Sequence, residues 1–500
     1  MKENSKESRY AWKLSKSDEA EISQNPNLNF MIYRNFYKNL WSLTLPIYLQ
    51  MISTVLIAML NSLLLRWIDG GVWTAVVNKA NFAYNWVIFL PSFASAGVFV
   101  IMGNMLGQGR ETDLHKAIFT GWMFNLLITF IVIFGLLGMK NFTYRWVNLE
   151  EEYWKTADII YYINLVILFL TSINVVSQRA EIAIGKMKTI FLVLVLSNIV
   201  NTIIVWTVAL TTPYAAIGTA FGSFGSAIFL TIFLLVLNFK HFNIKAIFTQ
   251  NKSCWNKSII KLILIIGVPT AIEAMIFNFA GAFTTKYVTF ASSEFGRDDA
   301  LFNTLIAAQQ ITNFGLLLSS SLGQVSSIFV ARLIGSNIRG WEIKVANRFW
   351  YLTLMIALPF SLITLILAYP LLMIYNIPVD VIFSVGIFML LIIGFQDFGR
   401  TMNQVGLSCL RAAKYTVVPV ICAAITLSIF NIGFVILANS LIFPNSLDYS
   451  NQDLINNRAI TLMLTICLIQ AIEEIVRGSI YWILWNKKVW IKSARSNLIN

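Results

Sequence analysis

The sequence has few charged residues: Asp, Glu, Lys and Arg make up only 12% of its 500 residues. A soluble domain needs about a quarter of its residues charged to cover its surface, so this scarcity excludes a soluble globular protein. Hydrophobic residues instead make up 57% of the chain. They fall in runs that are too long and too many for core helices, which indicates a polytopic membrane protein.

Histidine and cysteine are also scarce, with two and four copies respectively. His115 and His241 lie at predicted loop edges, and the cysteines have neither the spacing of a metal site nor that of a disulfide framework. We find no nucleophile–base pair, metal cluster or nucleotide-binding loop. We therefore expect no enzyme activity, no metal site and no cofactor. A polar stretch opens the chain, so we expect no cleavable signal peptide.

About twelve apolar segments follow this polar stretch, and each is long enough to cross a bilayer, for which about 20 residues suffice. They are 41–65, 76–104, 114–138, 157–180, 187–211, 214–238, 258–285, 302–331, 347–370, 381–410, 416–440 and 459–486. The pattern predicts an all-α membrane protein with about twelve transmembrane helices.

The loops between these segments alternate in charge. In loops after odd-numbered segments, acidic residues offset most of the basic ones. The central loop, the loop after segment 8 and the C-terminal tail are richly basic. Positive loops stay cytoplasmic, so both termini are predicted to face the cytoplasm from the plasma (inner) membrane. The net charge of +13 then reflects topology and an anionic inner leaflet, and we expect no nucleic acid to bind.

The two halves of the chain resemble each other. Pro46 and Gln50 have the same spacing as Pro269 and Glu273. Two further pairs of stretches follow in the same order: 96–110 with 325–337, and 184–189 with 411–416. Six segments per half insert in one orientation, so we predict two six-helix lobes related by a pseudo-two-fold axis along the membrane normal.

This repeat predicts five parts of the chain. They are a cytoplasmic N-terminal tail at 1–39, an N-lobe of six transmembrane helices at 40–239, a basic cytoplasmic linker at 240–257, a C-lobe of six transmembrane helices at 258–486, and a basic cytoplasmic tail at 487–500. A cleft between two such bundles is the layout of an alternating-access carrier rather than of a channel.

The repeat motifs also carry a family resemblance. They are Leu45-Pro46-Ile47, Ala96–Arg110, Gly267-Val268-Pro269, Ala307-Ala308 with the run to Asn337, and Leu410-Arg411 before Lys414-Tyr415-Thr416. In order and spacing, the chain resembles the multidrug and toxic compound extrusion (MATE) family over its whole membrane part. The resemblance implies cation-coupled efflux by alternating access, in exchange for protons or sodium ions. We expect a monomer among membrane lipids that exports amphiphilic, cationic small molecules.

The chain departs from this family pattern at three places. Many members have an aspartate near the end of segment 1, where this chain has Asn61, and some have one near Val205. The leucine-arginine-glycine after segment 10 reads Leu410-Arg411-Ala412. Acids of the C-lobe are therefore the better candidates for cation coupling.

Three groups of charged residues lie inside the C-lobe segments. Glu273 stands alone in apolar sequence, where a carboxyl group is costly and is functional by default. Asp397 lies three residues before Arg400, on one helical face. We predict Glu273 and Asp397 as cation-coupling acids. The alternatives are a neutral, hydrogen-bonded Glu273 and a static Asp397–Arg400 pair, while the cluster at 473–477 is interpreted as structural.

Polar and aromatic residues of several segments are candidates for a substrate cavity. They are Gln50, Asn61, Asn201, Phe277, Asn278, Gln309, Asn313, Arg400 and Asn403. A different cargo on the same fold, a lipid-linked or anionic amphiphilic precursor moved by a flippase, is the alternative. Several arginines in the cavity would favour the flippase, whereas acids and aromatic rings would favour drug efflux.

Overall fold

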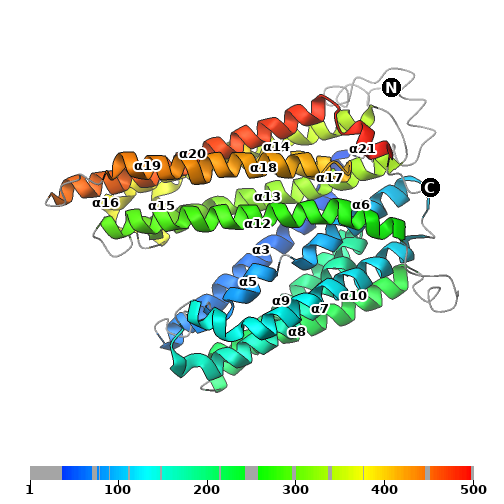
Figure 1. Cartoon of the computed structure of the whole chain (residues 1–500), viewed down its shortest axis with the longest axis horizontal. Coiled ribbons are helices and arrows are strands. Elements are labelled where there is room, and N and C mark those ends of the chain that lie inside the picture. The colour runs from blue at the N-terminus through cyan, green and yellow to red at the C-terminus, as the bar shows by residue number, and fades with distance from the viewer. Residues whose placement is uncertain are drawn as a thin grey trace, which may run out of the picture. The chain divides into compact units, whose positions relative to one another are not determined.

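The computed structural model describes most of the membrane part of the chain. The described residues are 36–69, 76–77, 79–88, 90–110, 113–146, 149–212, 215–242, 257–295, 300–335, 340–375, 377–444 and 451–496. The predicted N-terminal tail up to residue 35, and most of the predicted basic linker, lie outside them. All regular elements in these ranges are helices, which confirms the predicted all-α membrane class (Figure 1).

Eleven helices in the described ranges are long and apolar enough to cross a membrane. The second predicted segment, 76–104, is divided instead into α5 (Phe82–Val87) and α6 (Leu90–Gly107). Pro91 explains this break, because proline has no N–H to donate to the carbonyl four residues earlier and fits only the first turn of a helix. Each of the other eleven predicted segments coincides with a single long helix or with helices that follow one another directly or after one residue.

The helices divide into two compact units. Unit 1 contains the described residues of Met1–Gly267 and Ala331–Glu342, and unit 2 contains those of Val268–Val330 and Ile343–Asn497. The division falls inside α12 (Lys257–Glu294), α13 (Ala300–Gly335) and α14 (Trp341–Ile366), each of which supplies residues to both units.

Unit 1 is built from the helices of the first half of the chain. Besides α5 and α6 it contains α3 (Phe36–Asp69), α7 (Leu114–Trp146), the short 3₁₀-helix η3 (Glu151–Tyr153), α8 (Trp154–Ala183), α9 (Met187–Thr211) and α10 (Ala215–His241). Glycines at 218, 222 and 225 bring α10 against α9. A Cβ on Gly222 would lie 2.9 Å from the carbonyl oxygen of Asn201. Small residues let helix backbones approach closely inside a membrane.

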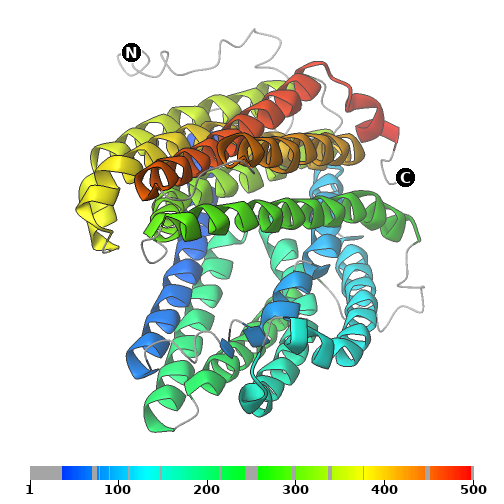
Figure 2. The same ribbon diagram turned by 60° about the vertical axis from the view of Figure 1, so that its left-hand side comes forward.

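Unit 2 contains the remaining helices. Those not yet named are α15 (Ala368–Ile374), α16 (Val379–Val381), η4 (Ile382–Gly386), α17 (Ile387–Ala412), α18 (Val417–Leu427), η5 (Ser428–Phe434), α19 (Val435–Ile442), α20 (Gln452–Asn486) and α21 (Ile491–Ser496). The π-helical turns η4 and η5 interrupt otherwise α-helical rods, and α18, η5 and α19 form one continuous rod (Figures 1 and 2).

Two glycines bring α17 and α20 together in unit 2. A Cβ on Gly399 would overlap the backbone of Glu474 and Ile475, and one on Gly478 would lie 2.7 Å from the Cβ of Met402. Because the two helices approach so closely, polar residues of α17 near Gly399 lie next to polar residues of α20 near Gly478. The close approach of the two helices therefore assembles the charged part of the candidate site.

Candidate functional site

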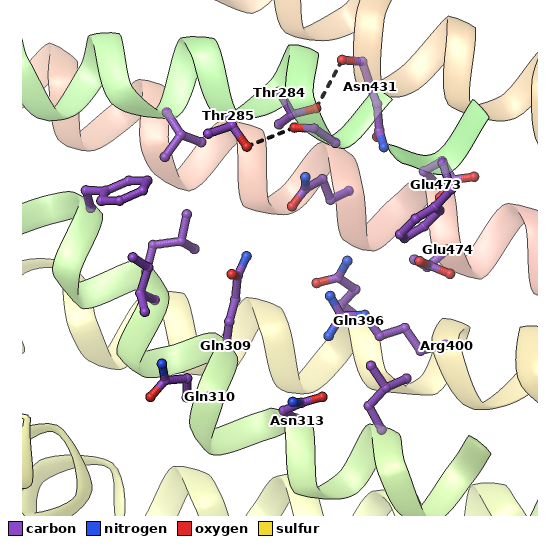
Figure 3. Close-up of a pocket in the computed structure, with 18 residues that line it drawn as sticks. Thr284, Thr285, Gln309, Gln310, Asn313, Gln396, Arg400, Asn431, Glu473 and Glu474 are labelled. Carbon is purple, nitrogen blue, oxygen red and sulfur yellow. Dashed lines mark hydrogen bonds between the residues drawn. The ribbon is translucent and has the colours of Figure 1, made fainter. Parts of the chain in front are cut away.

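A cavity of about 570 Å³ lies inside unit 2 (Figure 3). Helices α12, α13, α17 and α20 and the π-helical turn η5 all contribute to its wall. The described lining residues are Phe277, Gly281, Thr284, Thr285, Val288, Phe302, Leu305, Ile306, Gln309, Gln310, Asn313, Leu316, Gln396, Arg400, Asn431, Gln470, Glu473 and Glu474. Its volume falls in the range of about 300–1,000 Å³ that small-molecule sites occupy.

Side-chain amides dominate the polar part of the wall. They come from four elements, and they are Gln309, Gln310, Asn313, Gln396, Asn431 and Gln470. Figure 3 shows Gln309 extending from α13, and Gln396 and Arg400 from α17, toward the same open space. Asn431 approaches it from η5. The cavity therefore presents many neutral hydrogen-bonding groups within a largely apolar helical unit.

An acid–arginine network lies behind the wall between α17 and α20. Arg477 contacts Glu473 at 2.9 Å and Glu474 at 2.7 Å. Glu473 also accepts a hydrogen bond from Thr426 at 2.8 Å, and Glu474 accepts one from the Asn403 amide. The side chain of Arg477 is only 6% exposed. Charges this deeply buried are stable only when paired, so this network is held by its own partners.

Each of the two predicted coupling acids contacts an arginine of α17. Arg411, at the end of α17, donates a hydrogen bond of 2.8 Å to Glu273 on α12, whose side chain is 8% exposed. Arg400 contacts Asp397 at a longer distance of 3.5 Å. The Asp397 Oδ2 has no hydrogen-bond partner among the described residues. Both acids are therefore buried against an arginine, and Asp397 keeps one acceptor oxygen unused.

The structure brings together four of the nine predicted cavity residues. Phe277, Gln309, Asn313 and Arg400 line the cavity, and Asn403 lies behind it on Glu474. Asn278 is exposed on α12. The predicted coupling acids Glu273 and Asp397 are not among the described lining residues.

The remaining predicted residues lie in unit 1. Asn61 on α3 donates a hydrogen bond of 2.8 Å to the side chain of Asn201 on α9. Gln50 is half-buried on α3, where its carbonyl accepts a hydrogen bond of 2.8 Å from Ser53. These three residues are consequently no part of the cavity in unit 2.

Several residues of the site did not emerge from the sequence. Glu473 and Glu474 were interpreted as structural, yet both line the cavity as well as holding Arg477. Gln396, Gln470 and the partner role of Arg411 were not predicted. Intramembrane polarity was the available signal, but polarity alone does not tell which face of an apolar helix points inward.

Unit 1 contains a buried acid, Glu181, that was not predicted as a site residue. Glu181, near the end of α8, is fully buried and contacts the Nδ1 of His241 at 2.8 Å. Arg332 donates a hydrogen bond of 2.7 Å to the carbonyl of Ala183, two residues farther along. His241 was predicted at a loop edge, and it indeed ends α10, but its ring faces inward to this acid.

The long apolar helices, the paired intramembrane charges and the cavity define a multi-pass membrane transporter. Solved transporter structures share the fold. A single-residue variant of the Vibrio cholerae MATE transporter VcmN has a TM-score of 0.77 at 13% identity, with 90% of this chain and 96% of that chain covered. A MOP superfamily transporter from Pyrococcus furiosus has a TM-score of 0.72 at 14% identity, with 90% and 96% covered.

Sequence comparisons give the family. The MatE family model matches residues 46–207 and 298–437. The "Uncharacterized transporter YisQ" of Bacillus subtilis (strain 168) is 22% identical over 469 residues, which cover 91% of this chain and 95% of that protein. The chain belongs to the MatE family of transporters. The predicted MATE family membership is thereby confirmed.

Proposed function

We propose that this transporter exports an amphiphilic small molecule in exchange for protons or sodium ions by alternating access. The observation that carries the proposal is the cavity of unit 2, whose wall combines apolar side chains, amides and paired carboxylates inside membrane-spanning helices. Ionisable groups in such helices are costly and mark the pathways of ions and substrates. We place the protein in the plasma membrane as a monomer, with both termini in the cytoplasm.

Glu273 and Asp397 are the proposed coupling acids. Binding a proton or sodium ion at Glu273 weakens its 2.8 Å pair with Arg411 and so changes the contact between α12 and α17. Ion binding drives a conformational change only if the two states bind the ion differently. A salt bridge that joins two helices in one state supplies such a difference.

Arg400 connects the cavity with one of these two acids, Asp397. Its guanidinium lines the cavity and also contacts Asp397, at 3.5 Å. A cargo atom that attracts Arg400 competes with Asp397 for this guanidinium. Asp397 then holds a proton or sodium ion more readily, because a nearby positive charge has been drawn away. Cargo and coupling ion thereby influence each other through one arginine.

The flippase alternative predicts several arginines around the cargo. Among the described lining residues, one is an arginine, Arg400. Arg477 is held by two glutamates, and Arg411 is held by Glu273. The lining therefore supports a small-molecule exporter better than a carrier for a phosphate-bearing lipid.

Transport by purified protein in liposomes tests the proposal. The probes are a fluorescent organic cation and 4-nitrophenyl β-glucoside, each followed with a proton gradient, a sodium gradient and no gradient. We expect one gradient to drive a probe, and we expect Asp397→Asn to abolish that movement. Glu294→Gln, at the end of α12 away from both acids, is the matched control and should transport normally. Equal movement with and without gradients would contradict coupled transport.

A further inference from the structure

The geometry points to an uncharged, polyhydroxylated head group, such as a glycosyl group, as the part of the cargo that the unit 2 cavity binds. This inference rests on the proposed function, because it names the cargo chemistry of the same cavity. Neither the family nor the paired acids dictate it. It follows from the amides of the wall, from the state of the charges behind them, and from the backbone around Asn431.

The amides converge on the cavity from separate elements. Gln309 and Asn313 come from α13, Gln396 from α17, Asn431 from η5 and Gln470 from α20. Each carboxamide offers two N–H donors and a carbonyl acceptor with two lone pairs. A hydroxyl group also donates and accepts, so it uses both ends of an amide. A quaternary ammonium ion has no donor to give, and a phosphate or sulfate uses only the N–H groups.

The charges near the cavity are already committed to one another. Both glutamates of the wall contact Arg477, and Glu474 also accepts from Asn403. Among the charged side chains of the described lining, Arg400 has the longest ion pair, 3.5 Å to Asp397. An anionic head group would have to draw an arginine away from one of these buried acids and leave a carboxylate unpaired, which is strongly unfavourable. A neutral head group leaves the pairs of Glu473 and Glu474 with Arg477 intact, while its hydroxyl oxygens can accept a hydrogen bond from Arg400.

Asn431 is an independent observation that points to a ligand in the cavity. Asn431 is 7% exposed, and its side-chain Oδ1 has no hydrogen-bond partner among the described residues. It lies in the π-helical turn η5, a rare conformation that is frequent at functional sites. Thr284 donates a long hydrogen bond of 3.4 Å to the backbone carbonyl of Asn431 and not to its side chain. The side-chain amide of Asn431 is directed toward the cavity (Figure 3). A donor hydroxyl from the cargo satisfies the unpaired oxygen.

The apolar lining accounts for the other half of an amphiphile. Phe302, Leu305 and Ile306 on α13 and Val288 on α12 also line the cavity. These side chains bury an alkyl or aromatic group, with a gain proportional to the apolar area removed from water. A wall that offers both amides and apolar groups fits a small glycoside with an apolar aglycone.

Equilibrium dialysis of the protein in lipid nanodiscs tests this head-group preference. The probes share a nitroaryl group and differ in charge: 4-nitrophenyl β-glucoside, 4-nitrobenzyltrimethylammonium and 4-nitrophenyl phosphate. After subtraction of binding to empty nanodiscs, we expect the glucoside to bind at least tenfold more tightly than either ion. Gln309→Leu and Gln396→Leu should each weaken glucoside binding about fivefold, the effect of one lost neutral hydrogen bond.

Gln404→Leu, on α17 outside the described lining, is the matched control and should bind the glucoside within twofold of the wild type. Tighter binding of the ammonium or phosphate probe would overturn the inference, and so would glucoside binding that is equal in all variants. Because dialysis needs no ion gradient, it tests the head-group inference independently of the proposed gradient-driven transport. Gradient-driven transport of the cation without glucoside binding contradicts only the head-group inference, and glucoside binding without gradient-driven transport contradicts only the proposed function.

Discussion

Replacing Glu273 with glutamine should abolish coupled transport while the protein stays folded. The side chain of Glu273 is 8% exposed and that of Arg411 is 27% exposed, with 2.8 Å between them. The glutamine oxygen still accepts a hydrogen bond from Arg411, but it neither carries a charge nor binds a proton. A charge-assisted hydrogen bond becomes a neutral one, so we expect a loss of about 1 kcal/mol in the free energy of unfolding.

Arg411→Leu provides the contrasting perturbation. It leaves the Glu273 carboxylate buried without its arginine, which costs about 3–5 kcal/mol for a fully buried pair. Because Arg411 is partly exposed to water, we expect the lower end, about 3 kcal/mol. The double variant has no unpaired carboxylate, so its stability should return to within about 1 kcal/mol of Glu273→Gln alone.

Two assays compare the wild type, the two single variants and the double variant. Unfolding is followed by tryptophan fluorescence of the purified protein, and transport is measured in liposomes under a proton or sodium gradient. Normal gradient-driven transport by Glu273→Gln would refute the coupling role. A stability loss in Glu273→Gln as large as that in Arg411→Leu would show a static structural pair instead.

Three further predictions concern stability. Arg477→Leu leaves both contacting glutamates buried and unpaired and should cost about 3–5 kcal/mol in unfolding free energy, measured by chemical denaturation, whereas an unchanged midpoint would rule out a structural network. Gly399→Ala should lower the thermal midpoint because its Cβ overlaps the α20 backbone, while Gly433→Ala, whose nearest contact would be 3.6 Å away, serves as control; equal midpoints would contradict the packing. Burial lowers the pKa of Lys414, between α17 and α18, to about 8, and an unfolded lysine titrates near 10.4. The folded state then binds fewer protons between these values, so the unfolding free energy should rise by up to about 3 kcal/mol from pH 8 to about 10.5. Lys414→Asn, which tolerates the φ of +60°, should abolish this rise; its persistence would refute the assignment.

The helices and the pairs within one helix could be predicted from the sequence. Long apolar runs give membrane-spanning helices directly, although the break before Pro91 inside the second segment was not predicted. The spacing of Asp397 and Arg400, and of Glu473 and Arg477, places each pair on one helical face, where the structure shows the ion pairs.

Contacts between helices could not be predicted in the same way. Glu273 and Arg411 lie 138 positions apart, and nothing in the local pattern joins them. In a membrane both the lipid-facing and the packed face of a helix are apolar, so periodicity does not fix its rotation. The π-helical turn at Asn431 also has no reliable sequence signal, although it directs an amide into the cavity wall.

Gradient-driven export by the wild type and by Glu273→Gln in the same liposome preparation shows whether Glu273 couples an ion gradient to transport. The fluorescent cation and the nitrophenyl glucoside are each followed under a proton gradient and then under a sodium gradient. We expect one of these gradients to drive at least one probe against its own concentration gradient, and we expect Glu273→Gln to lose this movement. Wild-type movement that ignores both gradients, or undiminished movement in Glu273→Gln, would contradict it.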